Sequence, residues 1–331
     1  MTQSVTETLV LPTRTSALFH VIDPHVFDRT LLDELCEIAT RVRTLAKTDV
    51  GARALRDLLP TRRAMLYFTQ PSTRTFLSFN NACHILGMRT SEIRDPSTSS
   101  EVKGESFADS IRTFSSYVDV IIMRTKEAGR AAQAAKLMDS IPRPVPVINA
   151  GSGSDQHPTQ ALLDIYTLAR SFEPRGGIDG KVIGMMGDLK RGRTVRSLCY
   201  LMRHYEGVRL VFIAPKEFAM ERDIKSFLDQ HRIPYVETTE LASVLPDVRF
   251  CPTGGITPAG RAFALEHVDA LFMVIEDEAT LKGEVDRIRA AGSVRKFGIF
   301  ASGHLLCRAT PARSTCSTVC CRRSVSCSML R

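Results

Sequence analysis

At 331 residues the chain is longer than a single hydrophobic core usually supports, so its length predicts two domains. The composition, 44% hydrophobic and 24% charged, is typical of a globular protein, and no apolar stretch approaches the ~18 residues that a membrane span needs. The first twenty residues lack the pattern of a secretory signal. We therefore expect a cytoplasmic protein with no membrane partner.

The net charge of +8 comes almost entirely from the end of the chain. Residues 295–331 contain seven Lys and Arg and no Asp or Glu, so the residues before them sum to only +1. Five of the nine cysteines also lie beyond residue 301, and the other four are scattered singly, as in a protein of a reducing compartment. Because the basic residues gather in this segment, we expect no nucleic-acid partner for the folded part.

An amphipathic helix is expected over 27–47, and from there short apolar runs alternate with helical patterns. The expected strands cover 64–68, 88–93, 118–123, 145–148, 181–186, 208–213 and 247–250. The expected helices cover 74–86, 104–116, 129–138, 158–169, 192–204 and 221–230. This alternation predicts an α/β fold with two doubly wound parallel-sheet domains, joined by the 158–169 helix, and an active site in the cleft between them.

Three regions follow from this pattern. We place the first domain with the linking helix at 1–168 and the second domain at 169–301, with an atypical pattern after about 247. The last segment, 302–331, is rich in Ser, Cys and Arg and has no clear periodicity. We expect it to be disordered.

The most informative stretch is Ser72-Thr73-Arg74-Thr75, which follows an apolar strand and a proline and opens a helix. A helix N-terminus offers free N–H groups and the positive end of the helix dipole, and both favour phosphate. The hydroxyls add donors, and the guanidinium of Arg74 suits phosphate oxygens. The segment is therefore a candidate phosphate cradle, although the four residues alone also fit an ordinary capped helix start.

Four other segments lie where strands end or helices begin: the lysine-containing loop 97–106, Arg124, the Gly-rich loop 149–160 and the basic loop 187–197. Each segment alone also has an ordinary structural interpretation. The loop 97–106 fits a capped surface loop, and Arg124 fits a solvated strand end. His157 in the loop 149–160 fits a helix-capping histidine, and the loop 187–197 fits a solvated turn. Together they supply cations, an imidazole and an amide (Gln160) beside the phosphate cradle. This set suits a small, highly anionic substrate whose carbonyl is polarised while phosphate departs, with no metal and no cofactor.

Five short motifs follow one another along the chain: P-S-T-R-T at 71–75, K-G-E-S at 103–106, M-R at 123–124, H-P-T-Q at 157–160 and G-D-L-K-R-G-R-T-V at 187–195. Their order and spacing resemble the aspartate carbamoyltransferase family, and the match is good over about residues 60–215. S-T-R-T and H-P-T-Q alone fit any transcarbamylase, including the ornithine enzyme. The K-G-E loop and the 187–195 segment are similar to the aspartate enzyme in particular.

The resemblance implies an activity: transfer of the carbamoyl group of carbamoyl phosphate to the amino group of L-aspartate, in pyrimidine biosynthesis. It also implies roles for the residues that match. Ser72, Thr73, Arg74 and Thr75 would hold the phosphate; Arg124 and His157 would bind the carbamoyl oxygen and stabilise the tetrahedral oxyanion; Gln160 would hold the carbamoyl amino group; and Arg193 would bind the α-carboxylate of aspartate.

The resemblance further implies a homotrimer with shared active sites. Ser99 and Lys103 would reach the site of a neighbouring subunit, so Lys103 joins Arg74, Arg124 and His157 as an expected catalytic residue. A regulatory or pathway-partner chain is also compatible with the family.

After about residue 247 the resemblance ends. The family's Thr-Arg-x-Gln segment, whose arginine binds the side-chain carboxylate, has no counterpart in register, and 304–308 keeps only the two ends of the family's His-Pro-Leu-Pro-Arg loop. Arg249 and Arg261 are the substitutes that the sequence offers. Because an arginine–carboxylate contact contributes roughly 1.5–3 kcal/mol, its loss is expected to weaken aspartate binding by about ten- to a hundredfold.

This departure leaves three alternatives to aspartate carbamoyl transfer. The first is an impaired homologue that keeps carbamoyl phosphate binding or assembly, with a frameshift as one simple origin. The second is a transcarbamylase for another amine, and the last is nucleic-acid binding by the basic tail.

Overall fold

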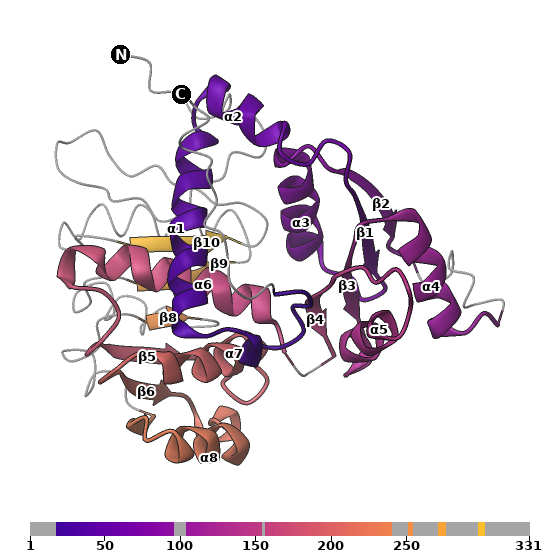
Figure 1. Cartoon of the computed structure of the whole chain (residues 1–331). Helices are drawn as coiled ribbons and strands as arrows, with labels where there is room; N and C mark the ends of the chain where they lie inside the picture. The colour runs from indigo at the N-terminus through magenta and orange to yellow at the C-terminus, as the bar shows by residue number, and fades with distance from the viewer. Residues whose placement is uncertain are drawn as a thin grey trace. The chain divides into compact units, whose positions relative to one another are not determined.

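The computed structural model describes residues 18–95, 104–153 and 156–239, together with the backbone of three strands near the end of the chain. The chain divides into two compact units (Figure 1). The first comprises Met1–Tyr166 and Arg196–Leu201, and the second comprises Thr167–Val195 and Met202–Arg331.

A four-stranded parallel sheet forms the centre of the first unit, in the order β2-β1-β3-β4. Its strands are β1 (Arg63–Phe68), β2 (Arg89–Ile93), β3 (Val120–Thr125) and β4 (Val147–Ser152). The helices α3 (Thr73–Ile85), α4 (Phe107–Tyr117) and α5 (Arg130–Asp139) connect these strands, and α6 (Pro158–Phe172) follows β4. Because every pair is parallel, the carboxyl ends of the strands share one edge of the sheet.

Alternate side chains of β1 pack on opposite faces of this sheet, because successive residues of a strand point in opposite directions. On one face Leu66 and Phe68 share a buried cluster with Phe76 of α3. On the other face Tyr67 packs against Phe114 of α4, with the ring centroids 5.5 Å apart. Burial on both faces explains why β1 is an almost unbroken apolar run.

Two helices precede the sheet, α1 (Arg29–Leu45) and α2 (Asp49–Arg56). Side chains cap their first turns: Asp28 accepts a hydrogen bond from a backbone N–H of α1, and Thr48 does the same for α2. Ser106 caps α4 in the same way. These caps satisfy N–H groups that have no partner within the helix.

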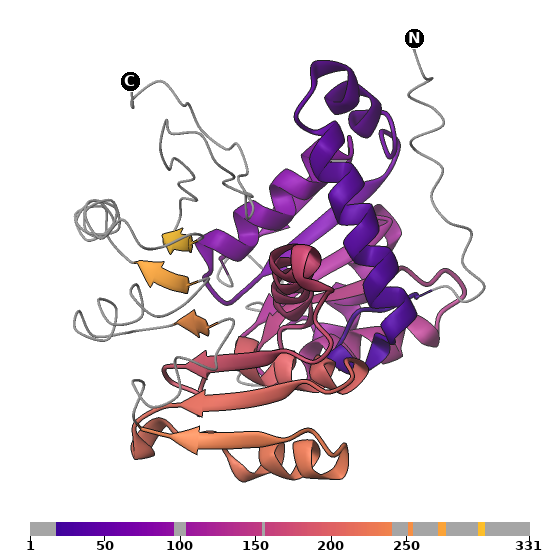
Figure 2. The same ribbon diagram turned by 90° about the vertical axis from the view of Figure 1, so that its left-hand side faces the viewer.

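The second unit contains a six-stranded parallel sheet in the order β10-β9-β8-β5-β6-β7. Its strands are β5 (Val182–Met186), β6 (Arg209–Ile213), β7 (Tyr235–Thr238), β8 (Cys251–Thr253), β9 (Leu271–Ile275) and β10 (Phe297–Ala301). The helix α7 (Arg193–Leu201) follows β5, and α8 (Arg222–Gln230) follows β6. Figure 2 shows β5, β6 and β7 as arrows pointing the same way, with α8 alongside.

Short 3₁₀ helices also occur among the described residues. They lie at Pro24–Val26, Glu173–Arg175, Met202–His204 and Lys216–Phe218. Across the ranges that the structure describes, none of the helices combines the length and apolar character needed to cross a lipid bilayer.

The predicted α/β class with two parallel sheets is confirmed. Several predicted bounds differ from the observed ones. The strands β3 and β4 both begin later than predicted and run on to Thr125 and Ser152, which still pair after an irregularity in the ladder. The elements α2, β7, β8, β9 and β10 were not predicted. The expected strand at 247–250 and the segment 302–331 lie outside the described residues.

Candidate active site

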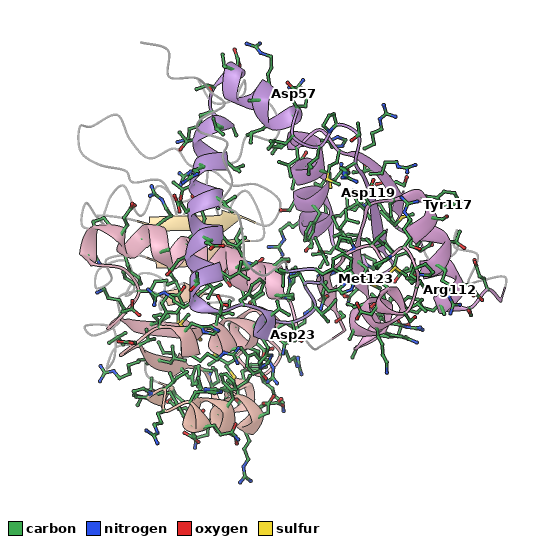
Figure 3. The ribbon with its side chains drawn as sticks, in the orientation of Figure 1. Asp23, Asp57, Arg112, Tyr117, Asp119 and Met123 are labelled. Carbon is green, nitrogen blue, oxygen red and sulfur yellow. The ribbon has the colours of Figure 1, made fainter. Side chains whose placement is uncertain are left out.

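Three segments of the first unit meet at the carboxyl edge of its sheet. Phe68, the last residue of β1, pairs with Arg124 of β3, and the next turn is tied to the same point by a hydrogen bond from the Gln70 N–H to the Arg124 carbonyl oxygen (3.2 Å). The end of β4 is tied to β3 by a bond from the Gly153 N–H to the Thr125 carbonyl oxygen (3.0 Å). In Figure 3 the labelled Asp119 marks the start of β3 and Met123 lies near this edge.

The start of α3 contains the residues that the sequence analysis predicts as a phosphate cradle. Ser72 stands at the cap position in extended conformation, yet among the described residues its side chain forms no capping hydrogen bond. Its hydroxyl instead donates to the Thr75 hydroxyl (3.0 Å). Side chains cap α1, α2 and α4, whereas α3, like the described α5 and α8, forms no side-chain cap. The first N–H groups of α3 are therefore available to a ligand beside the exposed Thr73 and Arg74.

Arg124 is buried, with a relative exposure of 7%. The alternative of a solvated strand end was therefore wrong: the residue lies inside β3, paired with Phe68, and its Nη1 donates to the Ala150 carbonyl oxygen (3.0 Å). A guanidinium held in a packed sheet edge keeps its charge and its direction. It is therefore a fixed cation at the place where β1, β3 and β4 end.

Gly151 brings Arg124 and His157 together. Its φ of +110° is one that side-chain-bearing residues rarely adopt, and a Cβ there would lie 2.5 Å from the Arg124 Nη1 and 3.3 Å from the His157 Cδ2. The Arg124 guanidinium and the His157 imidazole thus both lie next to Gly151, where the absence of a side chain leaves room for them. The sequence pointed to a Gly-rich ligand loop over 149–160, but the structure places 149–152 in β4.

The position of His157 is fixed through its backbone and its ring. Its N–H donates to the hydroxyl of Ser197 (3.1 Å), which in turn donates to the Gln156 side-chain oxygen (2.7 Å). The His157 carbonyl oxygen accepts from the N–H groups of Gln160 and Ala161, so the main chain does begin α6. The ring, however, is buried, and its Nδ1 lies 3.3 Å from the Thr159 hydroxyl. If that hydroxyl donates, Nε2 carries the hydrogen and can donate to a ligand oxygen.

Gln160 lies in the first turn of α6, and its Nε2 donates to Oδ1 of Asp164 one turn later (3.1 Å). Asp164 keeps only part of its surface exposed, and the protein atoms around its carboxyl deprive the charged form of water. This burial raises the pKa of Asp164 to about 7, and the hydrogen bond from Gln160 opposes the rise.

The basic loop of the second unit follows β5 at its carboxyl end, where the Gly187 N–H donates to the Ile213 carbonyl oxygen (3.2 Å). Asp188 closes the turn by accepting from the Arg191 N–H through Oδ1 (2.9 Å) and from the Gly192 N–H through its carbonyl oxygen (3.1 Å). Arg193 then begins α7 and is half-buried, whereas Lys190 and Arg191 are exposed. Arg193 therefore differs from the neighbouring Lys190 and Arg191 in being partly shielded from solvent.

Several predicted positions lie outside the described residues: Ser99, Lys103, Arg249, Arg261 and the 304–308 segment. Sequence reasoning also missed Gly151, Gln156, Ser197 and Asp164 as individual contributors. The spacing of Gln160 and Asp164 by four residues on a helix was a signal that they share a face, but nothing local pointed to Ser197. Within the part of the chain that the structure describes, no three His, Cys, Asp or Glu side chains group as metal ligands.

The arrangement in the first unit can bind a small anion and polarise a carbonyl. The start of α3 offers N–H groups and hydroxyls, Arg124 offers a buried cation, and His157 offers a second donor. Donors fixed before the ligand arrives stabilise developing negative charge without reorganising.

Residues 20–170 match the model of a family described as aspartate/ornithine carbamoyltransferase, carbamoyl-P binding domain. The chain is 41% identical over 229 residues to the chloroplastic aspartate carbamoyltransferase of Oryza sativa subsp. japonica. That match covers 68% of this chain, and the chain spans about 60% of the length of this curated relative.

Two solved structures are also similar. The catalytic subunit of M. jannaschii aspartate transcarbamoylase is 31% identical, with a TM-score of 0.64, over 88% of this chain and 87% of that chain. The aspartate transcarbamoylase from Trypanosoma cruzi, in complex with carbamoyl aspartate and phosphate, is 27% identical, with a TM-score of 0.65, over 88% of this chain and 86% of that chain.

Proposed function

The chain belongs to the aspartate/ornithine carbamoyltransferase family, and from that membership we propose that it transfers the carbamoyl group of carbamoyl phosphate to the amino group of L-aspartate. The products are N-carbamoyl-L-aspartate and phosphate, and the reaction serves pyrimidine biosynthesis. One observation carries the proposal: Arg124 and His157 lie against Gly151 at the sheet edge where α3 begins.

The charges and hydrogen-bond acceptors of carbamoyl phosphate match the cations and donors at this edge. Its phosphate is held by the N–H groups at the start of α3, by the hydroxyls of Ser72, Thr73 and Thr75 and by Arg74. Its carbonyl oxygen accepts hydrogen bonds from Arg124 and His157. Gln160, one turn into α6, binds the carbamoyl amino group. This assignment pairs the donors at the start of α3, together with Arg124 and His157, with oxygen atoms of the ligand.

The chemical step follows from these contacts. The uncharged amino group of aspartate attacks the carbonyl carbon, a carbon–nitrogen bond forms, and the carbonyl electrons move onto oxygen. Arg124 and His157 stabilise that oxyanion. As the intermediate collapses, the bond from carbon to the phosphate oxygen breaks, and the departing phosphate takes the proton that the amine releases.

The second substrate engages Arg193, which binds the α-carboxylate of L-aspartate. The side-chain carboxylate needs a further cation, for which Arg249 and Arg261 are the candidates. If neither serves, the same chain carries the carbamoyl group to another amine, and this second candidate function rests on the missing Thr-Arg-x-Gln segment.

We further propose a homotrimer in which Ser99 and Lys103 enter the site of a neighbouring subunit. A cytoplasmic location remains our proposal, and the rice relative is named as chloroplastic. The domain bounds 1–168, 169–301 and 302–331 remain our proposal for the organisation of the chain.

The test is product formation by the purified full-length chain from carbamoyl phosphate, with L-aspartate as acceptor and L-ornithine as control. We expect carbamoyl-aspartate and no citrulline. Citrulline alone would overturn the choice of acceptor. No product, while carbamoyl phosphate still binds, would leave the impaired homologue as the correct description.

A further inference from the structure

The side-chain amide of Gln160 has two chemically different ends, and only one of them suits the neighbour that it has in the structure. Its Nε2 lies 3.1 Å from Oδ1 of Asp164 on the same helix. An ionised carboxylate only accepts hydrogen bonds, so the NH₂ end of the amide must face it. The carbonyl end, Oε1, is then the end left for a ligand.

This orientation matters because the two ends of the amide select different ligand groups. A carbonyl oxygen accepts from an N–H and gives nothing to a methyl group or to a second carbonyl. An amide that was free to turn would offer its NH₂ end as often as its carbonyl end. The neighbour that holds the amide therefore decides what the amide recognises.

We propose that Asp164 is a positioning residue that turns the carbonyl oxygen of Gln160 toward the substrate and thereby selects the carbamoyl amino group. The inference rests on the proposed function, in which Gln160 binds that amino group. The burial of the carboxyl supports it, because a partly buried carboxylate makes a stronger hydrogen bond than an exposed one. Asp164 itself touches no reacting atom in this account.

The matched ligands are carbamoyl phosphate and acetyl phosphate, which carry NH₂ and CH₃ at the same position. Only the first can donate to Gln160 Oε1, whereas both present the same phosphate and carbonyl. The change in the ratio of their dissociation constants between variants therefore measures the amide contact. Leaving the Oε1 unpaired is expected to make this ratio roughly tenfold or more in the wild-type chain.

The experiment measures both dissociation constants for the full-length wild type, D164N, Q160A and the double variant, well above pH 7 so that Asp164 is ionised. D164N keeps the side-chain volume but can donate as well as accept, so it no longer dictates which end of the amide faces the ligand. We expect D164N to lose most of the preference for carbamoyl phosphate. Q160A should lose it completely, and D164N should then change nothing further in the Q160A background.

A control on the same helix is Y166F, which removes the hydroxyl that accepts from Thr40 Oγ1 (3.3 Å) without touching Gln160. It should keep the wild-type ratio. A general loosening of α6 would weaken both ligands equally in D164N and leave the ratio unchanged, and that result overturns the inference. A wild type that does not prefer carbamoyl phosphate contradicts the proposed role of Gln160 itself, so the two failures are distinguishable.

Discussion

Arg124 of the first unit and Arg193 of the second each stand at the carboxyl edge of a parallel sheet, yet they are held in different ways. Arg124 is buried inside β3 and is fixed by the Ala150 carbonyl oxygen, and its neighbour His157 is fixed by Ser197. Arg193 is half-buried at the first residue of α7, after a turn with exposed basic side chains. In the proposed function, the first substrate would therefore meet donors set in a packed core, and the second would meet a cation set at a helix end.

The largest effect should come from Arg124→Met, which keeps an extended apolar side chain in the sheet and removes the charge. Loss of a fixed donor to the oxyanion is expected to lower the rate of carbamoyl-aspartate formation by about 10²–10³-fold. The control is Arg112→Met, because Arg112 is an exposed partner of Asp109 on α4 (Figure 3) and such surface pairs contribute about 1 kcal/mol or less. Equal activity of the two variants would contradict the assignment of Arg124.

Arg193→Ala should separate the two halves of the site. We expect it to raise the KM for aspartate by roughly ten- to a hundredfold, because one charged hydrogen-bonding partner of a carboxylate is lost. The dissociation constant of carbamoyl phosphate should not change. Arg191→Ala is the matched control on the exposed side of the same turn, and steady-state kinetics should show only a small change. A larger effect of Arg191→Ala would reverse the roles of the two arginines.

Gly151→Ala should act through Arg124. The new Cβ would lie 2.5 Å from the guanidinium Nη1, so the side chain must move, and a displacement of about 1 Å in a catalytic group can cost up to ~10²-fold in rate. We expect a rate loss of about tenfold. Gly129→Ala shares the strain of a positive φ (+75°) but meets nothing within 4 Å, so it should lower stability and preserve the rate. Identical kinetics in the two variants would argue against the contact.

A further predicted effect concerns stability and pH rather than the rate. Since the pKa of Asp164 is raised from 3.8 to about 7 in the folded chain, the folded state binds more protons than the unfolded state between these values. Stability is therefore expected to fall as pH rises through this window and then to level off, by on the order of 1–4 kcal/mol. Asp164→Asn should remove the decline and be the more stable protein above pH 7. Parallel unfolding curves of both proteins across this range would refute the expectation.

Local patterns predicted much of this fold because five of the seven strands whose burial the structure describes are largely buried on both faces, namely β1, β3, β4, β5 and β6. The run 64–68 reads as a strand for that reason, and Leu66 and Tyr67 do pack on opposite faces. The short helix α2 was missed because it follows α1 after only a brief turn and has a glycine, Gly51, in its first turn. The strands β9 and β10 lie in the region where the family pattern is lost.

The parts of the site that consist of neighbouring residues in the sequence could be predicted. The parts that depend on contacts between residues far apart in the sequence could not. Ser72 to Thr75 could be read directly. The burial of Arg124 follows from its pairing inside β3, and the bond from His157 to Ser197 joins residues 40 apart in the sequence. Gly151 was visible as one glycine of a loop, but its contact with a guanidinium 27 positions earlier was not.

Calorimetric titration of the full-length chain with carbamoyl phosphate, in the absence of aspartate, tests the central claim most directly. The account predicts saturable binding by the wild type, weakened about a hundredfold or more by Arg74→Ala and unchanged by Arg89→Ala, an exposed arginine at the amino end of β2. Near-normal affinity in Arg74→Ala, or no binding by the wild type, would contradict a carbamoyl phosphate site at the carboxyl edge of the first sheet.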